Sequence, residues 1–330
     1  MEMTVEEIAI DIVPPGAETP VALAGKLHRP PVRSMYRSIV VVVHGVLEHQ
    51  KRYEEAATAL VESGHLVLTF DLPGHGASAS KPPGALPQWK PDSPALRLFV
   101  TAVEAACAKA RELEADLPVY LLGHSFGSLL GRIVVSGQWG THLHGAVFTG
   151  TAPHPGFVGK IGKKIMDRAI KRDGAEAPAT KVFDLTFRRY ARSVRNAAGA
   201  FDWISRDRSI VTRYENDPLC GFTPNLRLFE AVANAALAAN GKSCFDSTPR
   251  DLPVMFFSGS RDPVGGFGRG VMKVVKEYQR RGLRDLNVRI YPEARHEVLL
   301  ETNRAEVMGD IIRWLNIRLD LREHIITHYP

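Results

Sequence analysis

The segment that most constrains the fold of this chain is a short apolar run that leads through a serine between two glycines into a helical pattern. Residues 119–122 form the run, and Gly-His-Ser-Phe-Gly follows at residues 123–127. A serine on a sharp strand-to-helix turn presents its hydroxyl outward, and side chains two residues away on either side would collide. Gly123 and Gly127 meet that requirement. The segment predicts a buried strand, a strained turn at Ser125 and a helix.

Other short apolar runs repeat this strand signal along the chain, and helical patterns separate them. Continuous β-branched runs such as Ser38–Val43 are typical of strands buried on both faces of a parallel sheet. Strands are expected at 38–43, 65–70, 119–122, 146–149, 254–257 and 288–291, with weaker candidates at 8–13 and 21–27. Helices are expected at 53–63, 95–114, 128–136, 271–281 and 307–319. The alternation predicts an α/β fold with a mostly parallel central sheet covered by helices on both faces.

Residues 154–250 interrupt the alternation. They contain helical stretches but no convincing strand, and the strand pattern resumes after them. We therefore expect an inserted helical cap on a core built from residues 1–153 and 251–330. A length of 330 residues fits one large domain with such an insertion.

Composition narrows the class of protein. No run of about 18 apolar residues is present, and the acidic start lacks the pattern of a secretory signal. The three cysteines, Cys107, Cys220 and Cys244, are widely spaced, which argues against a disulfide framework and a zinc site. No Lys/Arg block typical of a nucleic-acid arm occurs. We expect a cytoplasmic protein that binds no nucleic acid.

Further stretches join the serine motif in a resemblance to a known family that covers roughly residues 35–320. They are His-Gly-Val-Leu-Glu-His at 44–49, Phe-Asp-Leu-Pro-Gly-His-Gly at 70–76, Ser-Gly-Ser-Arg-Asp-Pro at 258–263, Ala-Arg-His-Glu at 294–297, and Trp-Ile-Ser-Arg-Asp at 203–207 with Asp-Pro-Leu-Cys-Gly-Phe at 217–222. With these, the chain resembles the α/β-hydrolase superfamily and, within it, the monoacylglycerol lipase and lysophospholipase-like branch of serine aminopeptidase S33 type. The resemblance implies the α/β-hydrolase fold with a lid.

A serine nucleophile needs an adjacent base that a third group orients. In this fold the chain order is serine, acid, histidine. His296 follows the expected strand at 288–291 and is the candidate base. His324 and His328 lie in the expected tail beyond the last helix and are poorer alternatives.

The acid is chosen by its position on the sheet. Asp262 follows the strand at 254–257, so it falls at the same carboxyl edge as Ser125 and His296. Asp251 and Asp285 precede strands and fall at the opposite edge. Asp262 is therefore the candidate third member of a catalytic triad.

Acyl transfer also needs donors for the oxyanion. One is the backbone N–H of Phe126, directly after the nucleophile; the resemblance implies that the other is Val46, with Gly45 allowing close approach of the backbone. The glycine-rich stretch at 263–268 lacks the spacing of a phosphate loop, and the histidines of the turns lack a matching ligand set. No cofactor and no metal are expected.

A serine at position 125 favours acyl transfer. The main hypothesis is hydrolysis of the ester of a single-acyl lipid, either a monoacylglycerol or a lysophospholipid, or of a simple ester. The alternatives are a proline-iminopeptidase-like aminopeptidase and a non-catalytic, hydrolase-derived binding protein. Candidate walls of an acyl pocket in the cap are Ile161, Ile165, Val182, Phe183, Phe187, Trp203, Leu219, Phe222, Leu228 and Phe229. Acyl-chain length, head group and oligomeric state stay open.

The net charge of +6 is unevenly distributed. Residues 1–150 carry 12 basic and 15 acidic side chains, residues 151–250 carry 17 and 10, and residues 251–330 carry 13 and 11. The excess lies on the expected cap. A basic, partly apolar cap suits peripheral contact with an anionic membrane, and it disfavours a cationic peptide N-terminus as substrate. A merely solvated basic face is the alternative.

Overall fold

A central sheet of eight strands organises the structure, a computed structural model that describes residues 3–79, 95–195 and 197–328. The strand order is β1-β2-β4-β3-β5-β6-β7-β8. Strands β3 to β8 run parallel, while β2 pairs antiparallel with both β1 and β4. The strands are β1 (Thr4–Ile12), β2 (Val21–Arg29), β3 (Ser38–Val43), β4 (His65–Phe70), β5 (Val119–His124), β6 (Gly145–Thr149), β7 (Val254–Gly259) and β8 (Leu286–Tyr291). The mostly parallel sheet expected from the sequence is confirmed.

The apolar runs form strands because the side chains on both faces of each strand are buried. In β3, Val41 and Val43 enter the hydrophobic cluster on one face of the sheet, while Val40 and Val42 enter the cluster on the other. Successive side chains of a strand point to opposite faces, so a strand covered on both sides needs apolar residues at every position. This accounts for the continuous run that predicted the strand.

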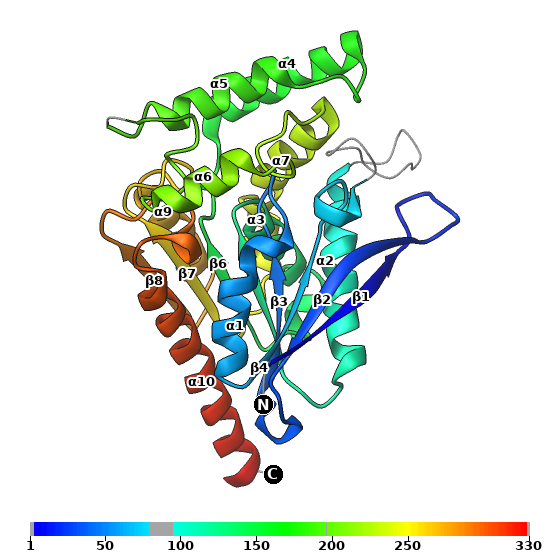
Figure 1. The fold of residues 1–330 in the computed structure, drawn as a ribbon, viewed down its shortest axis with the longest axis vertical. Helices are drawn as coiled ribbons and strands as arrows, with labels where there is room; N and C mark the ends of the chain where they lie inside the picture. The colour runs from blue at the N-terminus through cyan, green and yellow to red at the C-terminus, as the bar shows by residue number, and fades with distance from the viewer. Residues whose placement is uncertain (1–2, 80–94, 196, 329–330) are drawn as a thin grey trace.

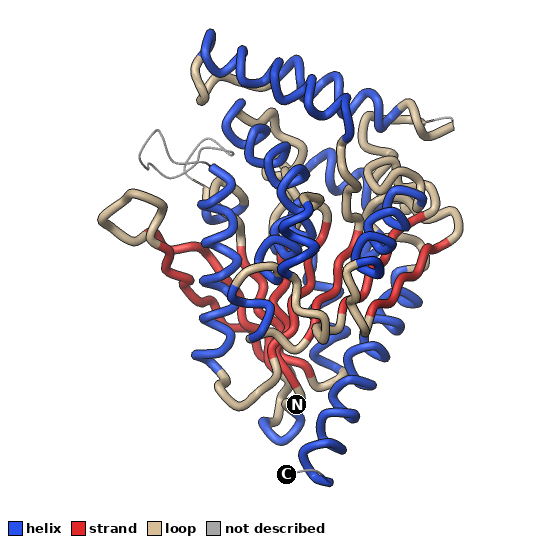
Figure 2. Tube along the Cα trace, turned by 180° about the vertical axis from the view of Figure 1, so that it is seen from behind, coloured by secondary structure: helices blue, strands red, loops and turns tan. Residues whose placement is uncertain are grey.

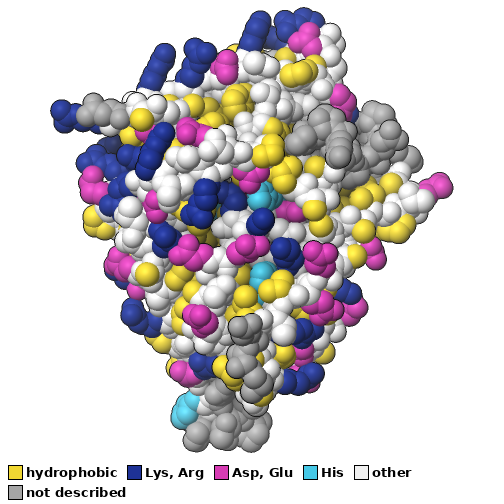
Figure 3. Space-filling view, in the orientation of Figure 1, with side chains coloured by type: hydrophobic (Ala, Val, Ile, Leu, Met, Phe, Trp, Pro, Cys, Tyr) yellow, Lys and Arg dark blue, Asp and Glu magenta, His cyan; other side chains and the backbone are white. Residues whose placement is uncertain are grey.

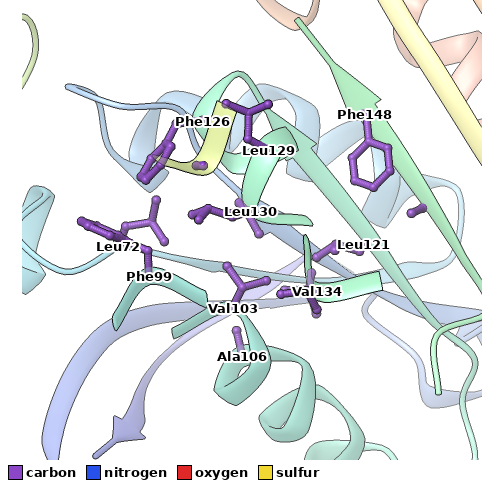
Figure 4. Close-up of a cluster of buried hydrophobic side chains, with 14 of the residues drawn as sticks. Leu72, Phe99, Val103, Ala106, Leu121, Phe126, Leu129, Leu130, Val134 and Phe148 are labelled. Carbon is purple, nitrogen blue, oxygen red and sulfur yellow. The ribbon is translucent and has the colours of Figure 1, made fainter. Parts of the chain in front are cut away.

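Helices cover both faces of the sheet (Figures 1 and 2). Helices α1 (Glu54–Glu62) and α10 (Arg304–His328) bury their apolar sides in one cluster. Helices α2 (Ala95–Leu113), α3 (Phe126–Val135) and α9 (Arg269–Arg280) contribute to the other cluster. Figure 4 shows part of this second cluster, where Val103 of α2, Leu121 of β5 and Leu130 of α3 lie together. The sheet is thereby held as a rigid base for the site at its carboxyl edge.

The end of the chain differs from the sequence expectation. Helix α10 continues to His328 instead of ending near residue 319, so His324 lies within a helix and not in a tail. Neither glycine nor proline occurs between Gly309 and Pro330, so nothing in the sequence stops the helix. After β4, the chain contains a short 3-10 turn at Gly76–Ser78, and residues 80–94 lie outside the described residues.

The insertion between β6 and β7 forms two helical layers. The insertion holds α4 (Gly156–Asp173), α5 (Thr180–Ala191), α6 (Arg208–Asn216), α7 (Leu226–Ala239) and α8 (Lys242–Ser247). Helix α7 packs on the core helices α2 and α3, with Ala231 and Ala235 buried at the contact. Helix α4 rests on α7 through Met166 and Leu226. Figure 1 shows α4 and α5 as the outermost layer, farthest from the sheet.

Candidate active site

Ser125 occupies a strained turn between β5 and α3. Its backbone lies in the left-handed half of conformational space, with φ 52° and ψ −113°, where residues other than glycine are uncommon. A Cβ on Gly123 would lie 2.5 Å from the carbonyl oxygen of Gly127, and a Cβ on Gly127 would lie 2.2 Å from that of Val43. A side chain at either position would therefore collide with the backbone, as the sequence pattern predicts.

Ser125, His296 and Asp262 come together at the carboxyl edge of the sheet, although they are far apart in sequence. The Oγ atom of Ser125 lies 2.9 Å from Nε2 of His296, and Nδ1 of His296 lies 3.0 Å from Oδ1 of Asp262. When Nδ1–H donates to the carboxylate, Nε2 is left to accept the serine proton. Backbone N–H of Val264 also donates to Oδ1 of Asp262, at 2.8 Å. The geometry is that of a nucleophile, a base and an orienting acid.

His296 and Asp262 each stabilise the charged form of the other. Burial by itself disfavours the charged imidazole and lowers the pKa of His296, but the negative charge of Asp262 and its hydrogen bond outweigh burial, so the pKa is raised overall. For Asp262, burial acts to raise the pKa, and His296 together with the backbone N–H groups of Val264 and Gly265 lowers it overall. Asp262 is thus a carboxylate, and His296 is suited to take a proton.

The turn after β3 lies directly against the serine. A Cβ on Gly45 would lie 3.2 Å from Cβ of Ser125, so glycine lets this backbone approach. Within the described part of the chain, neither the backbone N–H of Val46 nor that of Phe126 donates a hydrogen bond to another group. Phe126 begins α3, and the first N–H groups of a helix have no partner within it. The arrangement leaves two backbone donors without a partner, one on the residue after Ser125 and one in the turn that packs against Ser125.

A buried charge network behind the site was missed at the sequence level. Glu48 accepts hydrogen bonds from the backbone N–H of Gly45 and from the Tyr53 hydroxyl, and it pairs with Arg52. Arg52 also donates to both carboxylate oxygens of Glu297, each at 2.7 Å. Burial raises the pKa of Glu48, yet Arg52 and the neighbouring polar groups together bring it down to about 2. The sequence offered one signal of this network: each of the two acidic residues, Glu48 and Glu297, is adjacent to a histidine.

Aromatic residues of the insertion lie over the histidine. The ring of Trp203 is 5.2 Å from that of His296, and Tyr190 and Phe187 pack on Trp203 at 5.0 and 5.7 Å. Phe183 stacks on Phe187 at 4.4 Å. These rings supply an apolar surface beside His296, the candidate base.

Three of the candidate pocket walls lie elsewhere. Ile161 and Ile165 are 44% and 53% exposed on α4, and Leu228 is fully buried in the core cluster. Helical spacing groups residues on one side of a helix but does not say which neighbour that side meets. The sequence could therefore not separate walls of a pocket from core or surface positions.

Three other histidines near the site are hydrogen-bonded to neighbouring turns and strand ends. Nε2 of His44 accepts the backbone N–H of Leu72 at 2.9 Å. Nδ1 of His75 lies 2.9 Å from the carbonyl oxygen of Pro73, and Nδ1 of His124 lies 2.9 Å from Oγ1 of Thr149. Burial lowers the pKa of His75 and of His124 to about 3. These two rings are therefore neutral at ordinary pH.

One group of side chains has metal-binding atoms near one another. His49, Asp217 and Cys220 each place a ligand atom within 4.8 Å of the other two, and Nε2 of His49 is 2.9 Å from Oδ2 of Asp217. The positive charge of Arg52 acts on both Asp217 and Cys220. The carboxylates of Glu48 and Glu297 act on Cys220 as well. The hydrogen bond between His49 and Asp217 joins the turn after β3 to the segment after α6.

Comparison with known proteins places the chain in a family. A family model described as serine aminopeptidase, S33, matches residues 34–303. The chain belongs to this family. A monoacylglycerol lipase of Mycolicibacterium smegmatis is 24% identical over 282 residues, covering 84% of this chain and 88% of that protein. The phospholipase YtpA of Bacillus subtilis is 28% identical over 182 residues, covering 55% and 60%.

Solved structures of family relatives share the architecture. A thermostable carboxyl esterase from Bacillus coagulans, solved in complex with glycerol, superposes with a TM-score of 0.85 and 25% identity, covering 96% of this chain and all of that chain. A monoglyceride lipase from Saccharomyces cerevisiae superposes with a TM-score of 0.65 and 20% identity, covering 90% and 92%. The expected α/β-hydrolase fold is confirmed. This S33 family member is a serine hydrolase that cleaves esters, and the aminopeptidase and non-catalytic alternatives are not favoured.

Helices long and apolar enough to cross a bilayer are absent from the described ranges 3–79, 95–195 and 197–328.

Proposed function

We propose that this protein hydrolyses the carboxylic ester of a single-acyl lipid, a monoacylglycerol or lysophospholipid, or a simple ester, through an acyl-enzyme on Ser125. The observation that carries the proposal is the relay of 2.9 and 3.0 Å from Ser125 through His296 to Asp262, next to the aromatic side of the insertion. The relatives named monoacylglycerol lipase and monoglyceride lipase support this substrate class.

The reaction follows from the geometry in two halves. Ser125 Oγ attacks the ester carbonyl while Nε2 of His296 takes its proton, and the N–H groups of Val46 and Phe126 stabilise the oxyanion. The imidazolium of His296 then protonates the leaving alcohol oxygen, which leaves an acyl group on Ser125. Water, activated by His296, releases the fatty acid and restores the serine.

We assign residues 1–153 and 251–330 to the hydrolase core and residues 154–250 to the cap. The cap rings next to His296 provide apolar surface for an acyl chain, which gains free energy from leaving water. The outer cap also argues against an aminopeptidase: residues 156–195 hold eleven Lys or Arg and four Asp or Glu. A cationic amino terminus would be repelled by this excess.

The outer surface of α4 combines basic and apolar residues, and we assign it to peripheral contact with anionic lipid. Phe157, Ile161 and Ile165 are spaced four residues apart, and Phe157 is 76% exposed. Lys164 and Arg168 are exposed on the same helix. Figure 3 shows Lys and Arg side chains gathered over this edge of the molecule with apolar side chains between them. An amphipathic basic helix of this kind binds anionic lipid surfaces.

The membrane assignment is tested by vesicle flotation. Wild type should bind vesicles containing phosphatidylserine more than phosphatidylcholine vesicles, and binding should fall as salt rises. The double variant Lys164→Glu/Arg168→Glu should lose most of this binding. The matched control, Arg111→Glu/Arg284→Glu, changes the charge equally at exposed residues near the amino ends of the strands and should bind like wild type. Equal loss in both variants, or salt-insensitive binding, would overturn the assignment.

The enzymatic proposal is tested by active-site labelling and a substrate panel. A fluorophosphonate probe should label wild type, and Ser125→Ala should not be labelled. Equal labelling of the two proteins would refute the nucleophile. Rates should be highest on monoacylglycerols, lysophosphatidylcholine or short esters; faster cleavage of amino-acid amides would favour the aminopeptidase.

A further inference from the structure

Trp203, a residue of the insertion, lies against the candidate catalytic histidine. Its ring is tilted by 39° to the ring of His296 at 5.2 Å between centroids, and its side chain is only 6% exposed. The backbone carbonyl of Trp203 also accepts the backbone N–H of His296, at 3.3 Å. Trp203 thus contacts the histidine through both its backbone and its side chain.

The segment that carries Trp203 is firmly fixed to the histidine loop. Backbone N–H of Glu297 donates to the carbonyl of Ile204 at 2.7 Å, and the Ser205 hydroxyl donates to the carbonyl of Leu300 at 2.9 Å. The guanidinium of Arg295 donates to the carbonyl oxygens of Asp202 and Ser205, and Arg206 forms a 2.9 Å ion pair with the buried Glu301. These bonds hold the indole in one position relative to the imidazole.

Packing alone does not explain a tryptophan here. The Nε1–H group of Trp203 is buried and finds no hydrogen-bond acceptor among the described residues. A buried unpaired donor is unfavourable, and phenylalanine or leucine would fill much of the same space without it. What tryptophan offers beyond them is the strongest negative electrostatic potential over an aromatic face, which attracts a cation within about 6 Å.

We propose that Trp203 is a positioning residue for His296, whose indole holds the imidazole between Ser125 and Asp262 and stabilises the imidazolium that forms when Ser125 gives up its proton. The inference rests on the proposed triad. It makes the insertion part of the proton-transfer machinery, in addition to any role in binding substrate. Because the imidazolium exists only after proton transfer, this contact is stronger during the reaction than before it and so accelerates the chemical step.

The other groups that act on His296 come from several elements. Asp262 follows β7, Glu297 follows His296 itself, and Glu48 lies in the turn after β3; each favours the charged imidazole. His124, at the end of β5, has its ring centroid 4.8 Å away and is neutral because burial lowers its pKa to about 3. Tyr190 of α5 packs on Trp203, and burial, with the charge of Asp262, raises its pKa to about 12. A substitution of Trp203 removes none of these side chains.

The test compares Trp203→Leu and Trp203→Phe with Phe201→Leu, a control in the same aromatic cluster whose ring contacts Phe187 and Tyr214. The readouts are the pH profiles of kcat/KM and kcat for ester hydrolysis, and thermal unfolding. In Trp203→Leu the acid limb of the kcat/KM profile should move to lower pH by about one unit, and kcat should be about tenfold lower. A desolvated cation–π contact is worth about that much free energy. Trp203→Phe should shift less, and Phe201→Leu should keep the wild-type limb.

Two results would overturn the inference. One is an unchanged acid limb in Trp203→Leu with losses of activity and stability like those of Phe201→Leu, which would mean that the indole only packs. The other, if Trp203→Leu does not fold, is a wild-type limb in Trp203→Phe. Fluorophosphonate labelling of the same variants separates this failure from failure of the triad. If labelling requires Ser125 but the acid limb of the pH profile does not move, only the role of Trp203 is refuted. If labelling does not require Ser125, the triad itself is refuted.

Discussion

Both terminal nitrogens of the Arg52 guanidinium donate to Glu297, one to each carboxylate oxygen at 2.7 Å, and Glu297 directly follows His296. Because Arg52 also pairs with Glu48, which accepts the backbone N–H of Gly45, a single side chain connects the turn proposed for the oxyanion to the histidine loop. Both carboxylates are almost entirely buried. Bidentate geometry in a buried setting makes this a strong constraint on the relative position of the two loops.

The role of Arg52 can be tested by Arg52→Lys, which keeps the charge but cannot bind Glu297 through two nitrogens while also bonding to Glu48. We expect the free energy of unfolding to fall by about 2 kcal/mol, the range for a hydrogen bond to a charged group, and kcat to fall with it. Urea denaturation and initial rates measure both. Arg261→Lys is the matched control, because its pair with Glu293 is mostly exposed and should change stability by less than about 0.5 kcal/mol. Equal effects in the two variants would contradict the role of Arg52.

The pH dependence of ester hydrolysis follows from the raised pKa of His296. Burial lowers that pKa, and Asp262 raises it further than burial lowers it. The base must be neutral, so activity is present above the pKa and is lost as pH falls through it. We expect the acid limb of kcat/KM to have its midpoint above the ordinary value of 6.5. A midpoint below 6.5 would show that burial dominates instead.

Asp262→Asn separates orientation from packing. The amide fits the same buried space but cannot stabilise the imidazolium and favours the wrong tautomer of His296. We expect kcat to fall by about 10⁴-fold with thermal stability close to wild type. Asp251→Asn, at an exposed aspartate paired with Arg284, should retain wild-type kcat. A small loss of kcat in Asp262→Asn would mean that another carboxylate orients the histidine.

Arg132 of α3 joins the end of α7 to the helices on the sheet, and its contribution to stability can be tested. Its fully buried guanidinium donates to the carbonyl of Ala239 at 2.6 Å, to Oδ1 of Asn240 at 3.1 Å and to the Tyr278 hydroxyl at 3.3 Å. Arg132→Met leaves these acceptors buried without a donor, and we expect a loss of about 3 kcal/mol in urea denaturation. Fluorophosphonate labelling of the folded protein should persist. The exposed Arg172→Met should leave the stability unchanged.

Much of the fold and of the candidate site could be predicted from local pattern. Runs such as 38–43 and 119–122 predicted the buried parallel strands because every position had to be apolar. Ser125, Asp262 and His296 could be selected because each follows a strand, and the carboxyl ends of parallel strands share one edge. The end of α10 could not be placed as well, since the absence of helix breakers permits a helix to continue but does not measure how far it does.

The sequence by itself indicated the strands, the serine turn and the three candidate residues of the relay, because short-range periodicity, glycine sterics and the position of a residue just after a strand can be read from neighbours in the chain. The tertiary structure alone decided that Arg52 joins Glu48 to Glu297, that Trp203 lies on His296, and that Ile161 and Ile165 of α4 are exposed. Each of these depends on a contact between distant segments or on the absence of one. Helical or strand spacing fixes which residues share a side, but only the packing of whole elements determines what that side meets.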